Sequence, residues 1–247
     1  MRRRASAPAP RLGPTVEFER EQWPDVSATL ARQDWDLVIP HLLRAGADVA
    51  TVQPQLQRFG ELLLQWNRLA SNLISKNDEE RMVARHFTEA LEPAHWLKSD
   101  NATNWLDFGS GGGFPAVPLA LAGVGTNWTL VESRRTKCLF LRRAAEQLGL
   151  KGVRIEQARL EDLVASSHLA GAFDGFTSRA TLTAVPTLAL AAMLVAPGGH
   201  AYLWKGSRRE DEMAKDESWK LAWELDGLLG IGTGQTVVAR FIRRDNG

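Results

Sequence analysis

A glycine-rich stretch from Asn104 to Pro115 carries the clearest chemical signal in this chain. It reads as a short apolar strand that ends in Asp107, then a turn of glycines, then a helix that opens near the proline. Glycine permits a backbone with positive φ and lets a ligand approach the main chain closely. A helix N-terminus adds free N–H groups and the positive end of its dipole. The stretch therefore predicts a ligand-binding turn, although a purely structural turn is compatible with the same residues.

Two classes of cofactor site use such a turn. The dinucleotide fingerprint needs glycine at its first, third and sixth places, and the sixth place here is Phe114. The other pattern is an acid followed by glycines at alternate positions, and this chain has it: Asp107, Gly109, Gly111 and Gly113. That pattern resembles the S-adenosylmethionine loop of class I methyltransferases.

A further acid, Glu132, follows the next apolar run, Trp128 to Val131. An acid at the end of the second strand can accept hydrogen bonds from both ribose hydroxyls of a bound nucleoside. A solvated strand end is the alternative interpretation of the same residue. The helix predicted after it, from Arg135 to Leu148, is rich in basic side chains, which either bind phosphates or form a solvated face.

Composition limits the remaining possibilities. The chain has 247 residues, 44% of them hydrophobic and 24% charged, which suits one α/β domain with an N-terminal extension. Lys and Arg number 30 against 29 for Asp and Glu, so net charge says nothing about a nucleic-acid partner. The single cysteine, Cys138, excludes an internal disulfide framework and favours a cytoplasmic location. No apolar run approaches the ~20 residues of a membrane span. The 5 histidines lack metal-ligand spacing, so we expect no metal.

Three regions are expected along the chain. Residues 1–50 comprise a basic, proline-containing tail and a segment without a clear pattern. Residues 51–100 form a helical cap, because a helix from Pro54 carries an apolar stripe and a second helix is predicted over 78–97. The stripe comprises Leu56, Phe59, Leu63, Trp66 and Ala70, and the inward residues of the second helix are Met82, Phe87 and Leu91. Residues 101–247 form the sheet domain.

Apolar runs alternate with helical stretches through the sheet domain. Beyond the first two strands, we expect strands at 153–157, 173–178 and 201–204 and a closing pair at 219–225 and 236–242. Five alternating strands and a closing pair predict the seven-stranded methyltransferase layout, not a six-stranded parallel Rossmann sheet. The predicted fold is thus α/β, Rossmann-like and mostly parallel, with a helical N-terminal extension.

Several stretches from about Gln53 onward share the pattern of one family. They are Trp66-Asn67, Asn72-Leu73, His86, the glycine loop with Phe114-Pro115, Val131-Glu132-Ser133, Lys137, Phe140-Leu141, Ala158 to Asp162, Ser178-Arg179-Ala180 and Lys205-Gly206. Together they resemble the bacterial 16S ribosomal RNA (guanine-N7) methyltransferases, the RsmG or glucose-inhibited division protein B family. The chain departs from that family in having Thr88-Glu89-Ala90 where Asp-Ser usually follows the helical His-x-x, and Ala116 where glycine usually follows the loop proline.

The resemblance implies an enzyme that uses S-adenosylmethionine as cofactor. Gly109, Gly111 and Phe114 would wrap the methionine end and the ribose, and Glu132 would hold the ribose hydroxyls. It further implies adenine contacts, largely through backbone groups, at Leu160 and Glu161 after the third strand, although an ordinary helix N-terminus is the alternative there. At the end of the fourth strand it implies a cofactor or phosphate contact at Arg179. For the last residue, a surface charge is the alternative.

The implied reaction methylates N7 of a guanine in 16S ribosomal RNA, in the 530-loop region. N7 already carries a lone pair, so no catalytic acid or base is expected. The candidate RNA-binding residues are Arg134, Lys137 and Lys205. The expected partner is 16S RNA or a small-subunit particle, and the protein is expected to be a monomer without membrane association. A methyltransferase for another substrate and a non-enzymatic RNA-binding assembly protein remain the alternatives.

Overall fold

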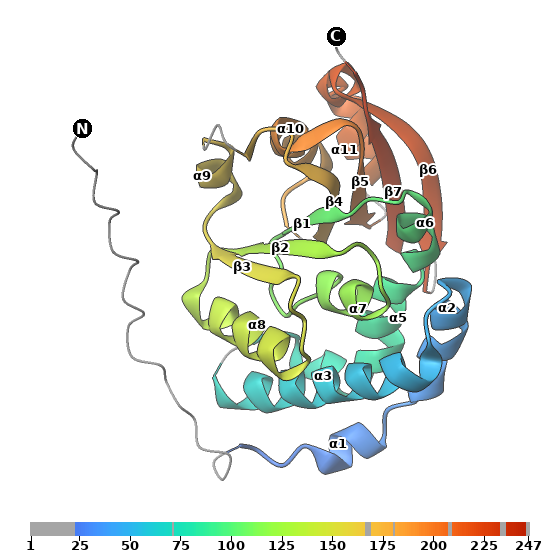
Figure 1. Cartoon of the computed structure of the whole chain (residues 1–247), viewed down its shortest axis with the longest axis vertical. Helices are drawn as coiled ribbons and strands as arrows, with labels where there is room; N and C mark the ends of the chain where they lie inside the picture. The colour runs from blue at the N-terminus through green and yellow to red at the C-terminus, as the bar shows by residue number, and fades with distance from the viewer. Residues whose placement is uncertain are drawn as a thin grey trace, which may run out of the picture.

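The computed structural model describes residues 23–70, 72–165, 169–179, 181–206, 209–232 and 236–245. Seven strands of this part form one sheet in the order β3-β2-β1-β4-β5-β7-β6. The first five run parallel, and β7 is antiparallel to both β5 and β6 (Figure 1). Their bounds are β1 (Asn104–Phe108), β2 (Asn127–Glu132), β3 (Val153–Gln157), β4 (Phe173–Arg179), β5 (Val195–Lys205), β6 (Trp223–Ile231) and β7 (Thr236–Arg243). The predicted seven-stranded, mostly parallel sheet is confirmed.

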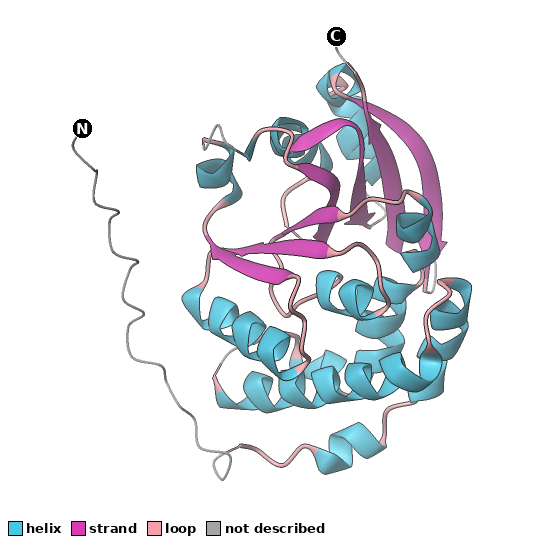
Figure 2. Ribbon diagram, in the orientation of Figure 1, coloured by secondary structure: helices cyan, strands magenta, loops and turns pink. Residues whose placement is uncertain are grey.

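Helices cover both faces of this sheet, as the cyan ribbons of Figure 2 show around the magenta strands. One face carries α7 (Ala116–Leu121) and α8 (Arg135–Gln147), and α3 (Val49–Leu69) packs outside them as a further layer. The helices of the other face are α9 (Leu160–Val164), α10 (Ala184–Leu194), α11 (Arg209–Lys215) and the 3₁₀ turn η5 (Ser218–Leu221). A separate hydrophobic core lies on each face. Central strands buried on both sides read as continuous apolar runs, as in β2.

The helical extension begins before residue 50. Asp48 caps α3 by accepting the N–H of Ala50 at 3.2 Å. Ahead of it lie α1 (Ser27–Ala31), η2 (Trp35–Val38) and α2 (Ile39–Arg44), and Val38 and Leu42 are fully buried in the same core as α3. The segment from residue 23 to 48 is thus part of the helical layer. The predicted basic tail falls on residues outside the described part of the chain.

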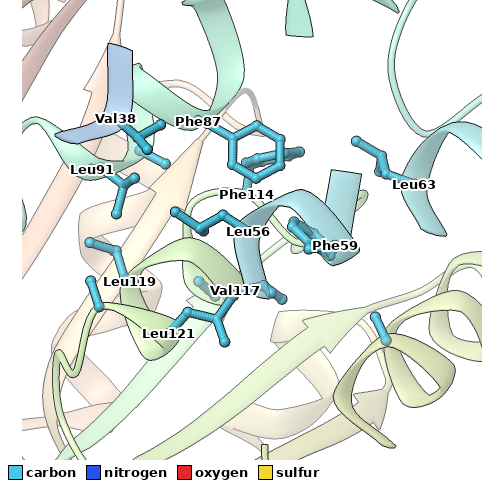
Figure 3. Close-up of a cluster of buried hydrophobic side chains, with 14 of the residues drawn as sticks. Val38, Leu56, Phe59, Leu63, Phe87, Leu91, Phe114, Val117, Leu119 and Leu121 are labelled. Carbon is cyan, nitrogen blue, oxygen red and sulfur yellow. The ribbon is translucent and has the colours of Figure 1, made fainter. Parts of the chain in front are cut away.

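The apolar stripe of α3 joins the extension to the glycine loop. Leu56, Phe59 and Leu63 are fully buried, and Figure 3 shows Leu56 and Phe59 near Phe114 and Val117 of α7, with Leu63 farther from them. The Phe59 and Phe114 ring centroids lie 5.5 Å apart. Ala70, expected to extend the stripe, instead follows the end of the helix and is exposed. The loop is therefore anchored on the helical layer through one aromatic side chain.

The single helix predicted over 78–97 is wrong. That region consists of α4 (Lys76–Glu79), the π-helical turn η3 (Val83–Phe87), α5 (Thr88–Leu91) and α6 (Ala94–Ser99). The wider hydrogen-bond spacing of a π turn interrupts the α-helical ladder, and Pro93 has no N–H to continue it. The inward positions are nevertheless correct, because Met82, Phe87 and Leu91 are fully buried.

Two strand predictions near the C-terminus are shifted. β5 begins at Val195 and includes Pro197 to Gly199, because the register between β4 and β5 is irregular there and such a break tolerates proline and glycine. Trp219 lies in η5, and β6 starts only at Trp223. No helix in the described residues is both long and apolar enough to cross a membrane.

Candidate active site

The glycine loop connects the end of β1 to α7 along the edge where the parallel strands end. Gly109 and Gly111 have φ of 71° and 53°, which side chains rarely adopt. A Cβ at Gly109 would lie 2.2 Å from Thr181 Cγ2, whereas a Cβ at Gly111 would meet nothing closer than 3.6 Å. Gly109 N–H and Ser110 N–H donate to the Val131 carbonyl at 2.9 and 3.1 Å, which ties the loop to β2. Glycine is thus needed for the turn itself and, at Gly109, for a close approach.

Glu132 is buried against this loop and is not a solvated strand end. Its exposed fraction is 8%. Oε2 accepts the Gly111 N–H at 3.0 Å, and Oε1 accepts the Arg134 N–H at 2.8 Å. A carboxylate has about four lone-pair sites, so acceptor capacity for two hydroxyls remains. The carboxylate therefore shapes the turn and leaves acceptors for a ligand.

Asp107 is a second buried acid at the loop, to which the sequence analysis assigned no role of its own. Its Oδ1 accepts the Thr177 hydroxyl at 2.6 Å, and its Oδ2 has no hydrogen-bond partner in the described part of the chain. Burial, aided by the nearby negative charge of Glu132, raises the pKa of Asp107 to about 7. An unpartnered buried oxygen at a cofactor loop is expected where a ligand completes the hydrogen bonding.

A cleft of about 410 Å³ opens beside the loop at the carboxyl ends of the strands. Its lining combines the glycine loop with residues of η3, α5, β4, β5 and α8: Leu73, Ile74, Arg85, His86, Glu89, Gly109, Ser110, Gly111, Gly112, Phe114, Lys137, Arg179, Trp204, Lys205, Gly206 and Thr236. In open α/β sheets, ligands bind at this edge where the strand order reverses, which here is between β1 and β4. Six of the predicted site residues therefore line one cavity: Gly109, Gly111, Phe114, Lys137, Arg179 and Lys205.

Leu160 and Glu161 lie apart from this cleft. The Leu160 side chain is fully buried in the core of the opposite face, and Glu161 is exposed at the start of α9. An adenine contact would therefore have to come from the main chain of this segment. Their role in cofactor binding stays a prediction.

Arg179 is buried in the cleft and is not a surface charge. Its side chain is 13% exposed and forms an ion pair of 3.0 Å with Glu89 Oε2. Nη2 also donates to His86 Nδ1 at 2.8 Å, and the guanidinium lies 6.0 Å from the centre of the Phe114 ring. Nη1 has no hydrogen-bond partner among the described residues. The arginine is thus held through one nitrogen and keeps a buried, unpartnered donor on the other.

His86 holds Arg179 as a neutral acceptor. Burial, together with the positive charge of Arg179, lowers the pKa of His86 to about 3. Since Nδ1 accepts the hydrogen bond from the arginine, the ring proton is assigned to Nε2, which lies 3.7 Å from Asp78 Oδ2. Two helical residues without an assigned role in the sequence pattern therefore form part of the site: His86 and Glu89. The signal available in the sequence was the family's helical histidine and the acid that follows it.

The three predicted RNA-binding residues separate in the structure. Lys137 Nζ lies only 3.8 Å from where a Cβ of Gly111 would be, so this lysine belongs to the loop side of the cleft. Lys205 Nζ donates to the Leu182 carbonyl, and burial lowers its pKa. Arg134 is exposed outside the cleft lining. Arg134 is thus an exposed surface cation, whereas Lys137 and Lys205 line the cleft.

The parallel sheet with an antiparallel β7, the glycine loop after β1 and the acid at the end of β2 together define the class I methyltransferase fold. The family model "GidB: rRNA small subunit methyltransferase G" matches residues 52–225, and the chain belongs to this family.

Relatives of known name agree with this assignment. The chain is 34% identical over 174 residues to a ribosomal RNA small subunit methyltransferase G of Stenotrophomonas maltophilia, covering 70% of this chain and 78% of the relative. The corresponding protein of Deinococcus radiodurans is 36% identical over 193 residues, covering 76% and 75%.

Solved structures agree at the level of the fold. Cofactor-bound Rv0187 from MTB has a TM-score of 0.56 at 15% identity, covering 78% of this chain and 91% of that one. A branched-chain polyamine synthase of Thermus thermophilus has a TM-score of 0.54 at 13% identity, covering 77% and 65%.

Proposed function

We propose that this protein binds S-adenosylmethionine and transfers its methyl group to N7 of a guanine in 16S ribosomal RNA. Membership of the rRNA small subunit methyltransferase G family supports the substrate class. The single observation that carries the proposal is the cleft in which the glycine loop and Lys137 face Arg179 and Lys205.

The residues at the loop fit the cofactor. Glu132 keeps acceptor capacity for ribose hydroxyls beside the Gly111 turn. The Arg179 guanidinium and the Lys137 ammonium are positive charges at the cleft that suit the carboxylate of a methionyl group. The buried, unpartnered Oδ2 of Asp107 at the start of the loop is an acceptor that suits its amino group. These complementary charges support S-adenosylmethionine over an uncharged nucleoside.

The reaction requires the protein mainly to position the reacting atoms. S-adenosylmethionine, when bound, supplies a methyl group attached to a positively charged sulfur. The lone pair of guanine N7 forms the new N–C bond, and the electron pair of the broken S–C bond stays on sulfur, so the positive charge passes from sulfur to the base. No proton is transferred, so no general base is needed, and the residues of the cleft have to hold the reacting atoms in line. The neutral His86 therefore serves to orient Arg179 and not to move a proton.

RNA binding is assigned to cations at the rim of the cleft. Arg134 is exposed at the N-terminal end of α8, next to the loop that Glu132 holds. Lys205 lies at the end of β5, across the cleft from the glycine loop. Phosphates bound on both sides would hold an RNA strand across the opening of the cleft.

The decisive experiment is the mapping of N7-methylguanine by mass spectrometry in 16S RNA from cells with and without this protein. We expect one methylated guanine to disappear without it and to return when the purified protein is supplied with S-adenosylmethionine. Methyl transfer to another substrate alone would assign a different methyltransferase activity. Failure to bind S-adenosylmethionine in calorimetry would leave a non-enzymatic RNA-binding role.

A further inference from the structure

One carboxylate in the cleft has no direct contact with the cofactor assigned to it. Glu89, on α5, lines the cavity with its side chain 16% exposed. Its Oε2 is paired with Arg179, whereas its Oε1 accepts no hydrogen bond from the residues that the structure describes. Burial raises the pKa of Glu89, and the arginine opposes that rise and favours the ionised form. The cleft thus contains a carboxylate with one oxygen available.

Glu89 faces the half of the cleft that lies away from the glycine loop. Its main-chain carbonyl accepts the Trp204 indole N–H of β5 at 2.8 Å. Its Oε1 lies 3.8 Å from where a Cβ of Gly232, at the end of β6, would be. The cofactor groups Gly111, Glu132 and Lys137 belong instead to the β1–β2 side. A ligand group that meets Glu89 Oε1 therefore approaches from the β5–β7 side, away from the glycine loop.

We infer that Glu89 recognises the Watson–Crick edge of the target guanine; this inference rests on the proposed function. Guanine presents two adjacent donors on that edge, N1–H and the 2-amino group, and a carboxylate presents only acceptors. Adenine has an unprotonated N1 there, which a carboxylate repels. N7 lies on the opposite edge of the purine, so a guanine held at Glu89 directs N7 away from that helix. Bases taken out of a stack are commonly read through this edge.

A contact between Glu89 and the guanine would also favour the transition state of methyl transfer. Methylation at N7 withdraws electron density from N1–H and makes it a stronger donor, so the contact with Glu89 strengthens as the new bond forms. A contact that is stronger in the transition state than in the ground state accelerates the reaction. The ion pair with Glu89 also offsets the positive charge of Arg179, which would otherwise repel a base that becomes cationic.

The test combines a protein variant with a substrate variant. Methyl transfer is measured for wild type and Glu89→Gln on 16S RNA carrying guanosine or inosine at the methylated position, since inosine lacks only the 2-amino group. In wild type, inosine should lower kcat/KM about tenfold or more, because a site built to bind an N–H rejects an analogue without it. In Glu89→Gln, guanosine should react at least about tenfold more slowly, and the preference for guanosine over inosine should shrink to about threefold or less.

Two further variants make the result specific. Glu89→Asp should retain most of the preference for guanosine, because it restores a carboxylate. Glu92→Gln is the matched control, since Glu92 belongs to the same helical region but accepts the Gly232 N–H and does not line the cleft. It should leave the preference unchanged.

Each other outcome overturns the inference. An undiminished preference in Glu89→Gln would make Glu89 only a support for Arg179. A loss of S-adenosylmethionine affinity with an unchanged preference for guanosine would show that Glu89 acts on the cofactor, directly or through Arg179, and not on the base. If wild type methylates neither RNA, the proposed function fails and the inference fails with it, whereas wild-type activity without a guanosine preference removes the inference alone.

Discussion

On the β1–β2 side of the cleft, the glycine loop is held by main-chain amides that donate to Glu132, whereas the β4–β5 side is held by charged side chains. Gly111 and Arg134 donate their N–H groups to Glu132 within one short stretch of sequence. Across the cleft, Arg179 is held by His86 and Glu89, which come from the helical extension far earlier in the chain. One side depends on local backbone geometry, and the other depends on how the extension packs on the sheet.

This difference separates two kinds of perturbation. A change in the extension should reach Arg179 through His86 and Glu89, while the hydrogen bonds between the loop and Glu132 stay intact. A change in the loop should alter cofactor binding directly. Phe114 belongs to both sides, because its ring lies 5.5 Å from Phe59 of α3 and beside Arg179.

The largest effect is expected from Arg179→Ala, on the side-chain half. The change leaves the carboxylate of Glu89 without its cation in a largely buried position, which costs about 3–5 kcal/mol of unfolding free energy. Methyl transfer should fall to background. Denaturant unfolding and a labelled-methyl assay measure both quantities, with Arg179→Lys as the charge-preserving control. Wild-type stability in the alanine variant would show that the ion pair contributes little.

On the backbone half, Glu132→Ala should weaken S-adenosylmethionine binding by about 1.5–3 kcal/mol, because a charged acceptor of hydrogen bonds is lost. The Gly111 N–H also loses its acceptor, so the loop should become more mobile while the Arg179 cluster is unchanged. Calorimetric titration measures the affinity, and the salt dependence of RNA binding serves as the control. Unchanged affinity in a folded variant would remove Glu132 from the cofactor site.

The pH dependence of stability should have opposite signs in the two halves. Asp107 has a pKa raised to about 7, so its contribution is present at low pH and is lost as pH rises from about 4 to 7. His86 has a pKa lowered to about 3, so its contribution is present above about pH 6.5 and is lost as pH falls below it. Each slope is about 1.4 kcal/mol per pH unit at most, and the two oppose each other between about pH 4 and 6.5.

Single variants should reveal the pH dependence of stability that each group contributes. Asp107→Asn should make the protein lose stability toward acid through His86, and His86→Gln should make it gain stability toward acid through Asp107. Unfolding free energies measured from pH 4 to 6.5 test this. Parallel profiles in wild type and both variants would contradict the assignment of the two buried groups.

The smallest effects are expected from alanine variants of Arg134 and Lys137, and the two variants should differ in cofactor affinity. Arg134→Ala should flatten the dependence of RNA affinity on salt by about 0.7 per lost phosphate contact and leave cofactor affinity unchanged. Lys137→Ala should weaken cofactor binding as well, because Nζ lies over the Gly111 turn. RNA binding against salt, with cofactor titration alongside, measures the difference. Equal cofactor affinities in both variants would return Lys137 to the RNA surface.

Local patterns predicted the parts of the protein that depend on neighbouring residues. The glycine loop, the acid at Glu132 and the presence of seven strands follow from alternation, turn chemistry and spacing along the chain. Apart from Ala70, the inward faces of the first two helical stretches were correct for the same reason, since an apolar residue at helical spacing is buried wherever the helix packs. The break of the 78–97 region was not predicted, because a π turn leaves no distinct mark in an apolar pattern.

The sequence by itself determined the glycine turn after the first strand and the acid at the end of the second, and its resemblance to a known family indicated the class I methyltransferase fold. Only the tertiary structure decided that His86 and Glu89 meet Arg179, that Asp107 is buried with an unpartnered oxygen, and that Lys137 faces the loop. The physical reason is that burial and charge pairing depend on which distant segments pack together. A lone arginine in a sequence does not specify its partners, whereas a glycine turn specifies its own backbone.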